Sequence, residues 1–305
     1  MNKNMLNSID KKILQLLNEN SWEKGTVLAD ILNISRITLQ KRIKQLINDG
    51  FIFNFNIIIN PYFYFKKIFY EIKTNPNKPK VLENLKSLKF ETLEGIIGDY
   101  SLIIKHNFLN NQEFLNNLEL IDNSMAESYR AIEVLKTYKE YGCVFVDEDG
   151  NLKNLNDIEK EILFELQAQG KEKLNTLSLA KKIGLSQPTI YKKINDLREW
   201  NFIKKFTISI NPDHLNCPIK FYMRLKVDPG FYDDVANNMK TYPQVIDLYR
   251  TGENYGLFSS IRTQNIDEFN DLINKFYQNN PINDSKTILV VSGMHKNYFF
   301  PSSLF

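Results

Sequence analysis

Two stretches of this 305-residue chain carry hydrogen-bond donors and cations at helical spacing. After Ser35, the apolar residues Leu39, Ile43 and Leu46 recur at i, i+4 and i+7, so the polar side chains between them fall on the opposite helix face. Such side chains can donate to base edges and bind phosphates. The candidate nucleic-acid contacts are Arg36, Thr38, Gln40, Lys41, Arg42 and Lys44 in the first stretch, and Gln187, Thr189, Tyr191, Lys192, Lys193, Asn195 and Lys204 in the second.

Residues that catalyse reactions or bind metals are few. His106, His214 and His295 lie at a strand end, after an Asn-Pro pair and near the C-terminus, and a lone histidine in such a place is more often structural than catalytic. Cys143 and Cys217 lack the cationic neighbours that activate a thiol, and two cysteines cannot form a disulfide framework or a cysteine-based zinc site. The usual zinc, hydrolase and nucleotide motifs are missing. The sequence therefore predicts no catalytic residue, no metal site, no cofactor and no enzyme activity.

An internal repeat organises the chain. Residues 28–61 align without gaps to residues 179–212, with 14 identities in 34 positions. Upstream, the segment Ile9–Leu14 matches Ile158–Leu163. A period of about 150 residues is too long for a solenoid repeat and indicates that a whole subunit was duplicated into a first and a second copy.

Each copy opens with three predicted helices. The second, Thr26–Leu32 in the first copy, ends in a turn at Asn33, and the equivalent turn falls at Gly184. Ser35 and Ser186 then provide N-caps for the third helices. A short helix, a tight turn and a capped helix with a polar, basic outer face form the helix-turn-helix arrangement, whose second helix enters the major groove of DNA.

Extended segments follow each third helix. In the first copy Phe51–Phe53 and Phe55–Ile57 predict two short strands that form a wing, and Phe202–Phe206 does the same in the second copy. The remaining apolar segments, from Lys67–Lys73 and from Lys220–Val227 onward, follow the order β-α-β-β-α-β of a ferredoxin-like fold. The expected fold class is α+β, with two winged helix-turn-helix domains alternating with two ferredoxin-like domains.

The third helix of the first copy carries a family resemblance. The segment from Leu32 to Ile52, with its Leu-Ser turn, its Arg-Ile-two residues-Leu run and its Gly-hydrophobic-Ile end, resembles the Lrp/AsnC (feast/famine) transcriptional regulators. The second copy keeps Leu185-Ser186 and Phe202-Ile203 but has Asn201 in place of the glycine. The resemblance implies an archaeal-like, sequence-specific regulator of double-stranded DNA, with a RAM (regulation of amino-acid metabolism) domain that pairs sheet to sheet and often binds an amino acid between subunits.

The resemblance and the repeat together set the expected domain boundaries. They are residues 1–62 for the first winged helix-turn-helix domain, 63–146 for the first RAM-like domain, 147–153 for a linker, 154–212 for the second winged domain and 213–305 for the second RAM-like domain. The two RAM-like domains could pair within one chain, or two chains could form a homodimer. Because the outer faces of the third helices differ, pairing within the chain favours an asymmetric DNA site.

The family's effector motif is altered in both copies. The family commonly has Thr-Gly-two residues-Asp between the second and third RAM strands, whereas this chain has Ile97–Ser101 and Thr251–Tyr255 at these places. Neither segment retains the Asp at its family position, and turn chemistry alone explains both glycines. The sequence leaves a small-molecule effector undecided. Its candidate contacts are Gly98, Asp99, Gly252 and Glu253.

Two other functions stay open. Some relatives of this family are tetrapyrrole (siroheme-type) decarboxylases, which use histidine and basic side chains around a bound macrocycle. A winged helix that has lost DNA binding could instead contact other proteins through aromatic residues such as Phe53 and Tyr191.

The charge distribution agrees with a nucleic-acid partner. The net charge is +3, from 39 basic and 36 acidic residues. Residues 1–62 carry 8 basic and 5 acidic side chains, residues 154–212 carry 10 and 7, and the remainder carries 21 and 24. Both helix-turn-helix segments are thus positive and the remainder is negative. With no signal-peptide pattern, no apolar run of membrane-spanning length and only two cysteines, we expect a cytoplasmic protein without membrane contact.

Overall fold

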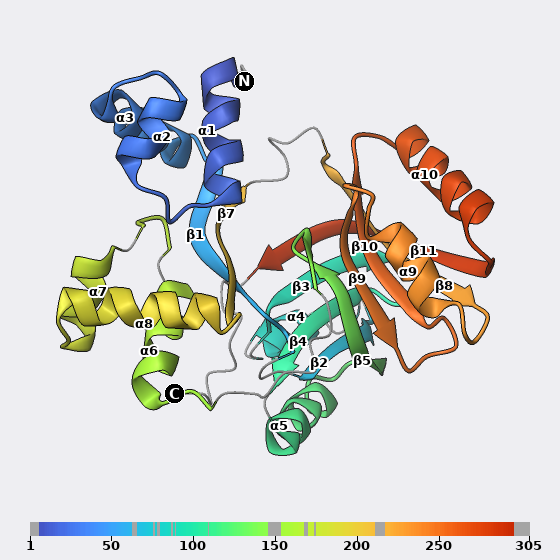
Figure 1. Ribbon diagram of the computed structural model, residues 1–305. Helices are drawn as coiled ribbons and strands as arrows, with labels where there is room; N and C mark the ends of the chain where they lie inside the picture. The colour runs from blue at the N-terminus through green and yellow to red at the C-terminus, as the bar shows by residue number, and fades with distance from the viewer. Residues whose placement is uncertain are drawn as a thin grey trace. The chain divides into compact units, whose positions relative to one another are not determined.

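The computed structural model describes residues 6–62, 66–75, 77, 80–86, 88, 90–108, 110–145, 154–167, 170–173, 175–210 and 217–295. The chain divides into two units, each of which combines segments from both copies (Figure 1). One unit, Met1–Asn60 with Leu152–Leu215, contains both helix-turn-helix segments and is called the helix-turn-helix unit. The other, Pro61–Asn151 with Asn216–Leu304, contains both ferredoxin-like segments and is called the sheet unit. Equivalent segments of the two copies therefore associate with each other.

The helix-turn-helix unit repeats three helices and one strand. Apolar residues at helical spacing build its first domain, where Ile13, Leu17 and Leu39 are buried together. The elements are α1 (Ser8–Glu19), α2 (Gly25–Ile31), α3 (Arg36–Asn48) and β1 (Ile52–Ile59), then α6 (Asp157–Gln167), α7 (Thr176–Ile183), α8 (Gln187–Glu199) and β7 (Ile203–Ile210).

The two strands of this unit pair across the copies. The predicted wing of two short strands in the first copy is wrong, because β1 is one continuous strand that pairs antiparallel with β7. Only Asn54 separates the two predicted segments, which is too short for a two-residue hairpin turn, so the backbone groups of β1 find partners on the equivalent strand instead. Helix α1 also contacts β7, and Trp22, which follows α1 in the chain, stacks on Phe206 at 4.7 Å between ring centroids. The Thr207 hydroxyl donates to the Asn18 carbonyl at 2.9 Å.

The sheet unit contains the predicted ferredoxin-like order twice. The first copy contributes β2 (Lys66–Lys73), α4 (Lys80–Lys86), β3 (Thr92–Ile97), β4 (Leu102–Phe108), α5 (Asn111–Asp122), β5 (Ser128–Glu140) and the short β6 (Cys143–Val144). The second contributes β8 (Ile219–Val227), α9 (Tyr232–Met239), β9 (Val245–Thr251), β10 (Leu257–Thr263), α10 (Ile266–Asn279) and β11 (Ile282–His295). The predicted α+β class is confirmed, and β5 and β11 are longer than the sequence pattern indicated.

Eight of these strands form a closed ring. The order runs β2-β4-β3-β11-β8-β10-β9-β5, and β5 also pairs with β2. The edge strands of one ferredoxin-like sheet, β3 and β5, thereby pair with β11 and β9 of the other. Closing the ring removes the unpaired edges that a single sheet of this kind would expose.

Among the described residues, three hydrophobic clusters lie in the sheet unit. Residues such as Tyr70 and Leu85 pack between the first sheet and its helices, and Met223 and Phe276 do the same in the second copy. A third cluster lies between the inner faces of the two sheets, with Phe69 at 4.7 Å from Phe258 between ring centroids. Both faces of each sheet are therefore buried over much of their area.

Charged residues share the interior of the ring with this third cluster. Lys105 Nζ lies 2.9 Å from a Glu91 oxygen and 2.5 Å from Glu140, which also contacts Lys67. The Tyr249 hydroxyl donates to the same Glu140 oxygen at 2.8 Å. Burial alone would raise the pKa of Glu140, but the two lysines outweigh it and lower that pKa to about 2. Glu140 is thus a buried anion that depends on cations and a hydroxyl around it.

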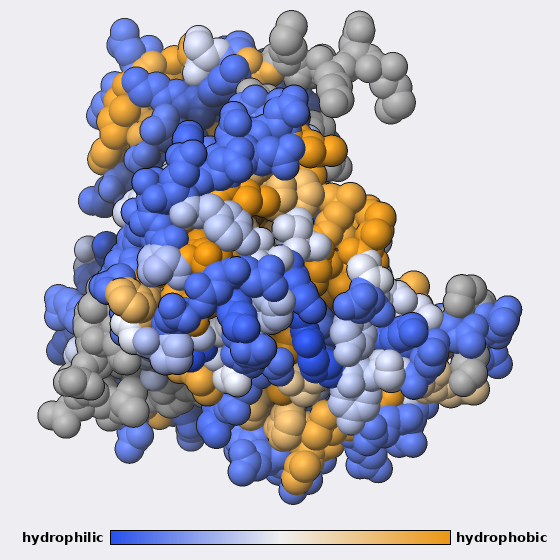
Figure 2. All heavy atoms as spheres, turned by 90° about the vertical axis from the view of Figure 1, so that its right-hand side faces the viewer, coloured by the Kyte–Doolittle hydropathy of each residue, from blue (hydrophilic) through white to orange (hydrophobic). Residues whose placement is uncertain are grey.

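One face of the molecule appears in Figure 2, where hydrophilic residues predominate and hydrophobic residues lie in separate patches. Among the helices described, none is long and apolar enough to cross a membrane.

Glu140→Gln should destabilise the sheet unit at pH 7 by about 3 kcal/mol, because Lys67 and Lys105 lose their shared anion. A carboxyl whose folded pKa lies below its unfolded value stabilises the fold above about pH 4 and loses this contribution as the pH falls toward 2. The difference between the variant and the parent should therefore shrink between pH 5 and pH 3, as urea midpoints would show.

Glu127→Gln serves as the control, because Glu127 forms an exposed pair with Lys73 at 3.5 Å. It should change stability by less than about 0.5 kcal/mol. Equal effects of the two substitutions, or a Glu140 effect that does not change with pH, would contradict the interpretation.

Candidate nucleic-acid interface

Both copies form the predicted helix-turn-helix geometry. The turn residues Asn33 and Gly184 have φ values of 52° and 79°, the left-handed conformation that reverses the chain after α2 and α7. The Ser35 hydroxyl accepts a hydrogen bond from the Thr38 amide at 3.0 Å and caps α3. In the second copy the Ser186 hydroxyl accepts from the Thr189 amide at 3.3 Å. The same local chemistry thus positions both recognition helices.

The apolar face of each recognition helix is buried, as its spacing predicts. Leu39 and Leu46 of α3 and Ile190, Ile194 and Leu197 of α8 are buried. Most predicted contact residues are exposed on the other face. These exposed residues are Arg36, Thr38, Gln40, Lys41 and Lys44 in the first copy and Gln187, Thr189, Tyr191, Lys192 and Lys204 in the second, whereas Arg42, Lys193 and Asn195 are half-buried.

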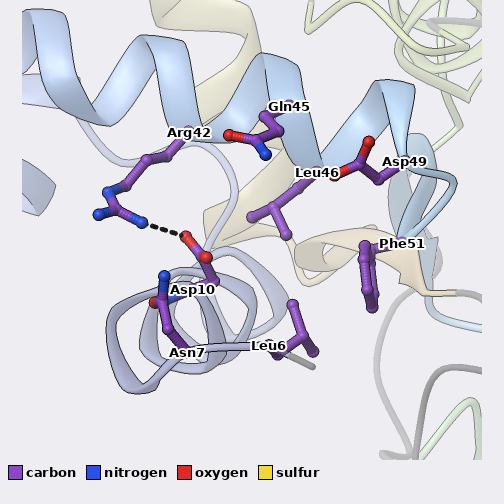
Figure 3. A pocket seen from close by; sticks show the side chains of 8 residues that line it. All are labelled: Leu6, Asn7, Asp10, Arg42, Gln45, Leu46, Asp49 and Phe51. Carbon is purple, nitrogen blue, oxygen red and sulfur yellow. Dashed lines mark hydrogen bonds and ion pairs between the residues drawn. The ribbon is translucent and has the colours of Figure 1, made fainter. Parts of the chain in front are cut away.

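Two predicted contact residues form ion pairs within their own domains. Arg42 Nη1 lies 2.9 Å from Asp10 Oδ1, which ties α3 to α1 (Figure 3). Lys193 Nζ lies 3.1 Å from Glu159 Oε1, which ties α8 to α6. These pairs occupy equivalent positions in the two copies, and at both positions the residue type differs while the charge is kept. The structure therefore gives both cations a partner inside the protein, a role that the sequence pattern did not distinguish from DNA contact.

The first ion pair borders a shallow pocket between α1 and α3. Its volume is about 220 Å³. Figure 3 shows Arg42 pointing across it toward Asp10, with Gln45 on the same helix and Asp49 at the C-cap of that helix. The lining residues are Leu6, Asn7, Asp10, Arg42, Gln45, Leu46, Asp49 and Phe51. The pocket is part of the helix packing of this domain.

The two recognition helices present different chemistry. On α3, Arg36 is followed by Ile37, whose side chain is 80% exposed. The equivalent positions on α8 are Gln187 and Pro188, and Tyr191, 56% exposed, stands where α3 has Gln40. Gln187 Nε2 also donates to the Thr176 hydroxyl at 2.9 Å. The duplication has therefore kept the scaffold and changed the outer face.

The histidines and cysteines do not form a reactive cluster in the part of the chain that the structure describes. His106 is buried, and its Nε2 lies 2.6 Å from the amide nitrogen of Asn117. His214 falls outside the described residues. Burial raises the pKa of the Cys217 thiol, which disfavours the nucleophilic thiolate. No group of three or more His, Cys, Asp or Glu residues in the described ranges is arranged to hold a metal ion.

Two of the four candidate effector residues line a cavity in the sheet unit. Gly98 and Asp99 border a space of about 290 Å³, whereas Gly252 and Glu253 do not. The cavity is also lined by charged residues that sequence reasoning missed, namely Glu71, Arg130, Arg224 and Lys286. A signal existed in the repeat, because Glu71 and Arg224 are charged residues at matching places in the otherwise apolar runs Ile68–Ile72 and Phe221–Leu225.

Comparisons with known proteins agree with this geometry. Residues 6–52 and 155–204 match a winged helix-turn-helix DNA-binding domain, and residues 220–298 match the Lrp/AsnC ligand binding domain. The fold and the two motifs thus define a protein of the helix-turn-helix transcriptional regulator class. The HTH-type transcriptional regulator FL11 of Pyrococcus furiosus is 35% identical over 142 residues, 47% of this chain and 92% of FL11. The chain belongs to the Lrp/AsnC family.

Other relatives extend the comparison. FL11 of Pyrococcus horikoshii is 38% identical over 119 residues, 39% of this chain and 78% of that protein. Both Pyrococcus relatives fit the archaeal-like character expected from the sequence. The crystal structure of the siroheme decarboxylase NirDL resembles the whole duplicated chain, with a TM-score of 0.70 at 16% identity over 96% of this chain and 95% of that chain. At this identity the likeness shows a shared fold alone.

Arg42→Met should lower the free energy of unfolding of the helix-turn-helix unit by about 1 kcal/mol, because it removes the partly buried pair with Asp10. Lys41→Met, at the exposed neighbouring position, should change it by less than about 0.5 kcal/mol. Denaturant unfolding of both variants measures the contrast. A stability loss that is equal in the two variants would show that the ion pair does not hold α3 against α1.

Proposed function

We propose that this protein is a sequence-specific, double-stranded DNA-binding transcriptional regulator that inserts α3 and α8 into the major groove. The observation that supports this most strongly is the pair of N-capped helices with exposed polar and cationic faces, present twice in a chain of a regulator family. Its relatives FL11 carry the name of HTH-type transcriptional regulators. The protein acts without catalysis in this proposal.

The side chains suit distinct roles along each helix. Arg36 and Gln40 lie in the first turns of α3, from which a recognition helix contacts base edges. Lys41 and Lys44 follow and would neutralise phosphates. On α8, Gln187 and Tyr191 replace the base-contacting pair. Because the two faces differ, the DNA site should be an imperfect palindrome, with unlike half-sites.

The decarboxylase alternative has less support. Its relatives use histidine around a macrocycle, and here His106 is engaged with Asn117 and does not line the cavity of the sheet unit. The whole-chain likeness to NirDL reflects fold. Absorbance typical of a tetrapyrrole in the purified protein would favour that alternative over the regulator.

We further propose that the two RAM-like domains of one chain pair with each other in solution, and that the boundaries 1–62, 63–146, 147–153, 154–212 and 213–305 delimit the functional domains. Contacts between the copies support the pairing. Lys220 Nζ lies 2.7 Å from a Glu94 oxygen, and the Tyr222 hydroxyl donates to the same carboxylate at 2.5 Å. Glu94 is 1% exposed, so it needs these partners from the second copy.

A charge reversal between the copies favours pairing of a first copy with a second copy over pairing of two like copies. Ile72 of β2 pairs with the first residue of β4, and Leu225 of β8 pairs with the first residue of β10. The residues that precede them, Glu71 and Arg224, are therefore equivalent, and they form an ion pair with each other. Pairing of two first copies would place Glu71 against Glu71. Pairing of two second copies would place Arg224 against Arg224. Buried like charges of this kind cost several kcal/mol.

Selection of bound fragments from genomic DNA at about 0.1 M salt tests the regulator proposal. Arg36→Ala should weaken binding to the enriched site about tenfold, since it removes a base contact. Lys41→Ala should weaken binding to all sequences and reduce the salt dependence by about one phosphate contact. Lys12→Ala on α1 is the control, because Lys12 is exposed outside the recognition helix.

If no sequence is enriched and affinity is negligible even at low salt, the protein is not a DNA-binding regulator. If Lys12→Ala weakens binding as much as Lys41→Ala, the contact surface lies elsewhere.

Glu71→Arg and Arg224→Glu should each lower the melting temperature of the sheet unit, because each places like charges together in the ring. The double reversal should restore part of the loss, since it exchanges the two charges but leaves Arg130 without the Glu71 carboxylate. Differential scanning calorimetry measures all three variants. A double variant that is as unstable as the sum of the single variants would contradict pairing through this contact.

A further inference from the structure

The two helix-turn-helix segments carry different charges on equivalent stretches of chain. These stretches run from the start of α2 or α7 into the following strand, and they are called the first head, residues 25–54, and the second head, residues 176–205. The first head has 4 basic and 2 acidic side chains, and the second head has 7 and 2. Ion pairs with α1 or α6 engage one cation of the first head and two of the second, namely Arg42, Lys182 and Lys193. The second head therefore keeps the larger positive charge.

Four cations of the second head lie beside its recognition helix, where the first head has none. They are Lys181 and Lys182 in the last turn of α7, and Lys204 and Lys205 at the start of β7. The equivalent residues of the first head are Asp30, Ile31, Phe53 and Asn54. In helix-turn-helix proteins the helix before the recognition helix crosses the DNA backbone, and lysines there bind phosphates. The second head has thus gained cations where a DNA backbone would lie.

The first turn of the recognition helix shows the opposite trend. Arg36 of α3 is exposed, and its equivalent on α8 is Gln187. The Gln187 side chain already donates to the Thr176 hydroxyl at 2.9 Å. The residue equivalent to Thr176 is Gly25, which has no side chain that could hold Arg36 in the same way. The first head therefore keeps an available donor in the turn that contacts base edges, whereas the second head engages its donor internally.

Ile37 adds an apolar group to the same turn of α3. Its side chain is 80% exposed and follows Arg36 directly. The equivalent residue of α8 is Pro188, which suits the start of a helix but has a smaller, fixed ring. The apolar group that a base pair presents in the major groove is the C5 methyl of thymine. Ile37 is therefore placed to contact a base in a way that the second head does not reproduce.

We propose that the two heads divide the recognition of DNA. The first head discriminates between sequences, with Ile37 against a thymine methyl, and the second head binds the phosphates of any sequence. Tyr191 on α8 agrees with this division, because a phenol hydroxyl can donate to a phosphate oxygen. The inference rests on the proposed function and deepens it. A homodimer cannot divide the work in this way, because its two heads are identical.

Replacement of each thymidine of the selected duplex in turn by deoxyuridine, which lacks only the methyl group, tests the role of Ile37. At one position the parent protein should lose affinity about fourfold, the effect of one buried methyl group. Ile37→Ala should show no such loss at that position, and its exposed site leaves folding unchanged. Fluorescence anisotropy measures both affinities. If no position shows the loss, or if the loss persists in Ile37→Ala, the proposal fails.

Lys181→Met tests the second head, because Lys181 is an exposed cation of α7. It should weaken binding to the selected site and to a duplex of unrelated sequence by the same factor. The slope of log affinity against log salt should fall by about 0.9, for one lost phosphate contact. Ile37→Ala should weaken binding to the selected site alone, and Lys12→Ala on α1 should leave both affinities and the slope unchanged.

Two results would overturn the division, and they differ in what they say of the proposed function. If Lys181→Met reduces the preference for the selected site, the second head reads sequence, and the division fails while the regulator function stands. If neither duplex is bound at low salt, the proposed function fails and the division fails with it.

Discussion

The closure of the eight-stranded ring is the constraint on which the sheet unit depends. A single ferredoxin-like sheet exposes two edge strands and one uncovered face. Here the edges β3 and β5 pair with β11 and β9, and the uncovered faces bury each other. This burial places charges such as Glu94 in an interior where the other copy supplies Lys220 and Tyr222 as partners. The ring therefore makes the two copies mutually dependent, which separate subunits of a single-copy relative achieve only by association.

Duplication also explains the contrast between scaffold and surface in the helix-turn-helix unit. The pairs Arg42–Asp10 and Lys193–Glu159 keep the same geometry with four different residues, because the packing of the recognition helix on the first helix still requires it. The outer positions have no such constraint. Once both helices belong to one chain, each face can change independently, which symmetry forbids in a homodimer.

Local patterns predicted the helices and most strands, because apolar spacing, Ser caps and the Asn33 and Gly184 turns act within a few residues. The wing was wrong because the partner of β1 is a strand about 150 residues away, which no local pattern indicates. The charged lining of the cavity in the sheet unit was missed for a related reason. Glu71 alternates with the apolar Tyr70 and Ile72, as a residue on a solvent-facing side of a sheet would. That side of the first sheet is buried because the second sheet packs against it.

The central claim is that one chain pairs its own RAM-like domains and offers two unlike recognition helices to one DNA site. Light scattering of the full chain, alone and bound to a duplex that carries its selected site, tests this most directly. The expected result is the mass of one chain when free, and one chain per duplex in the complex. A free particle with the mass of two chains, persisting at micromolar concentration and binding the duplex as such, would contradict it.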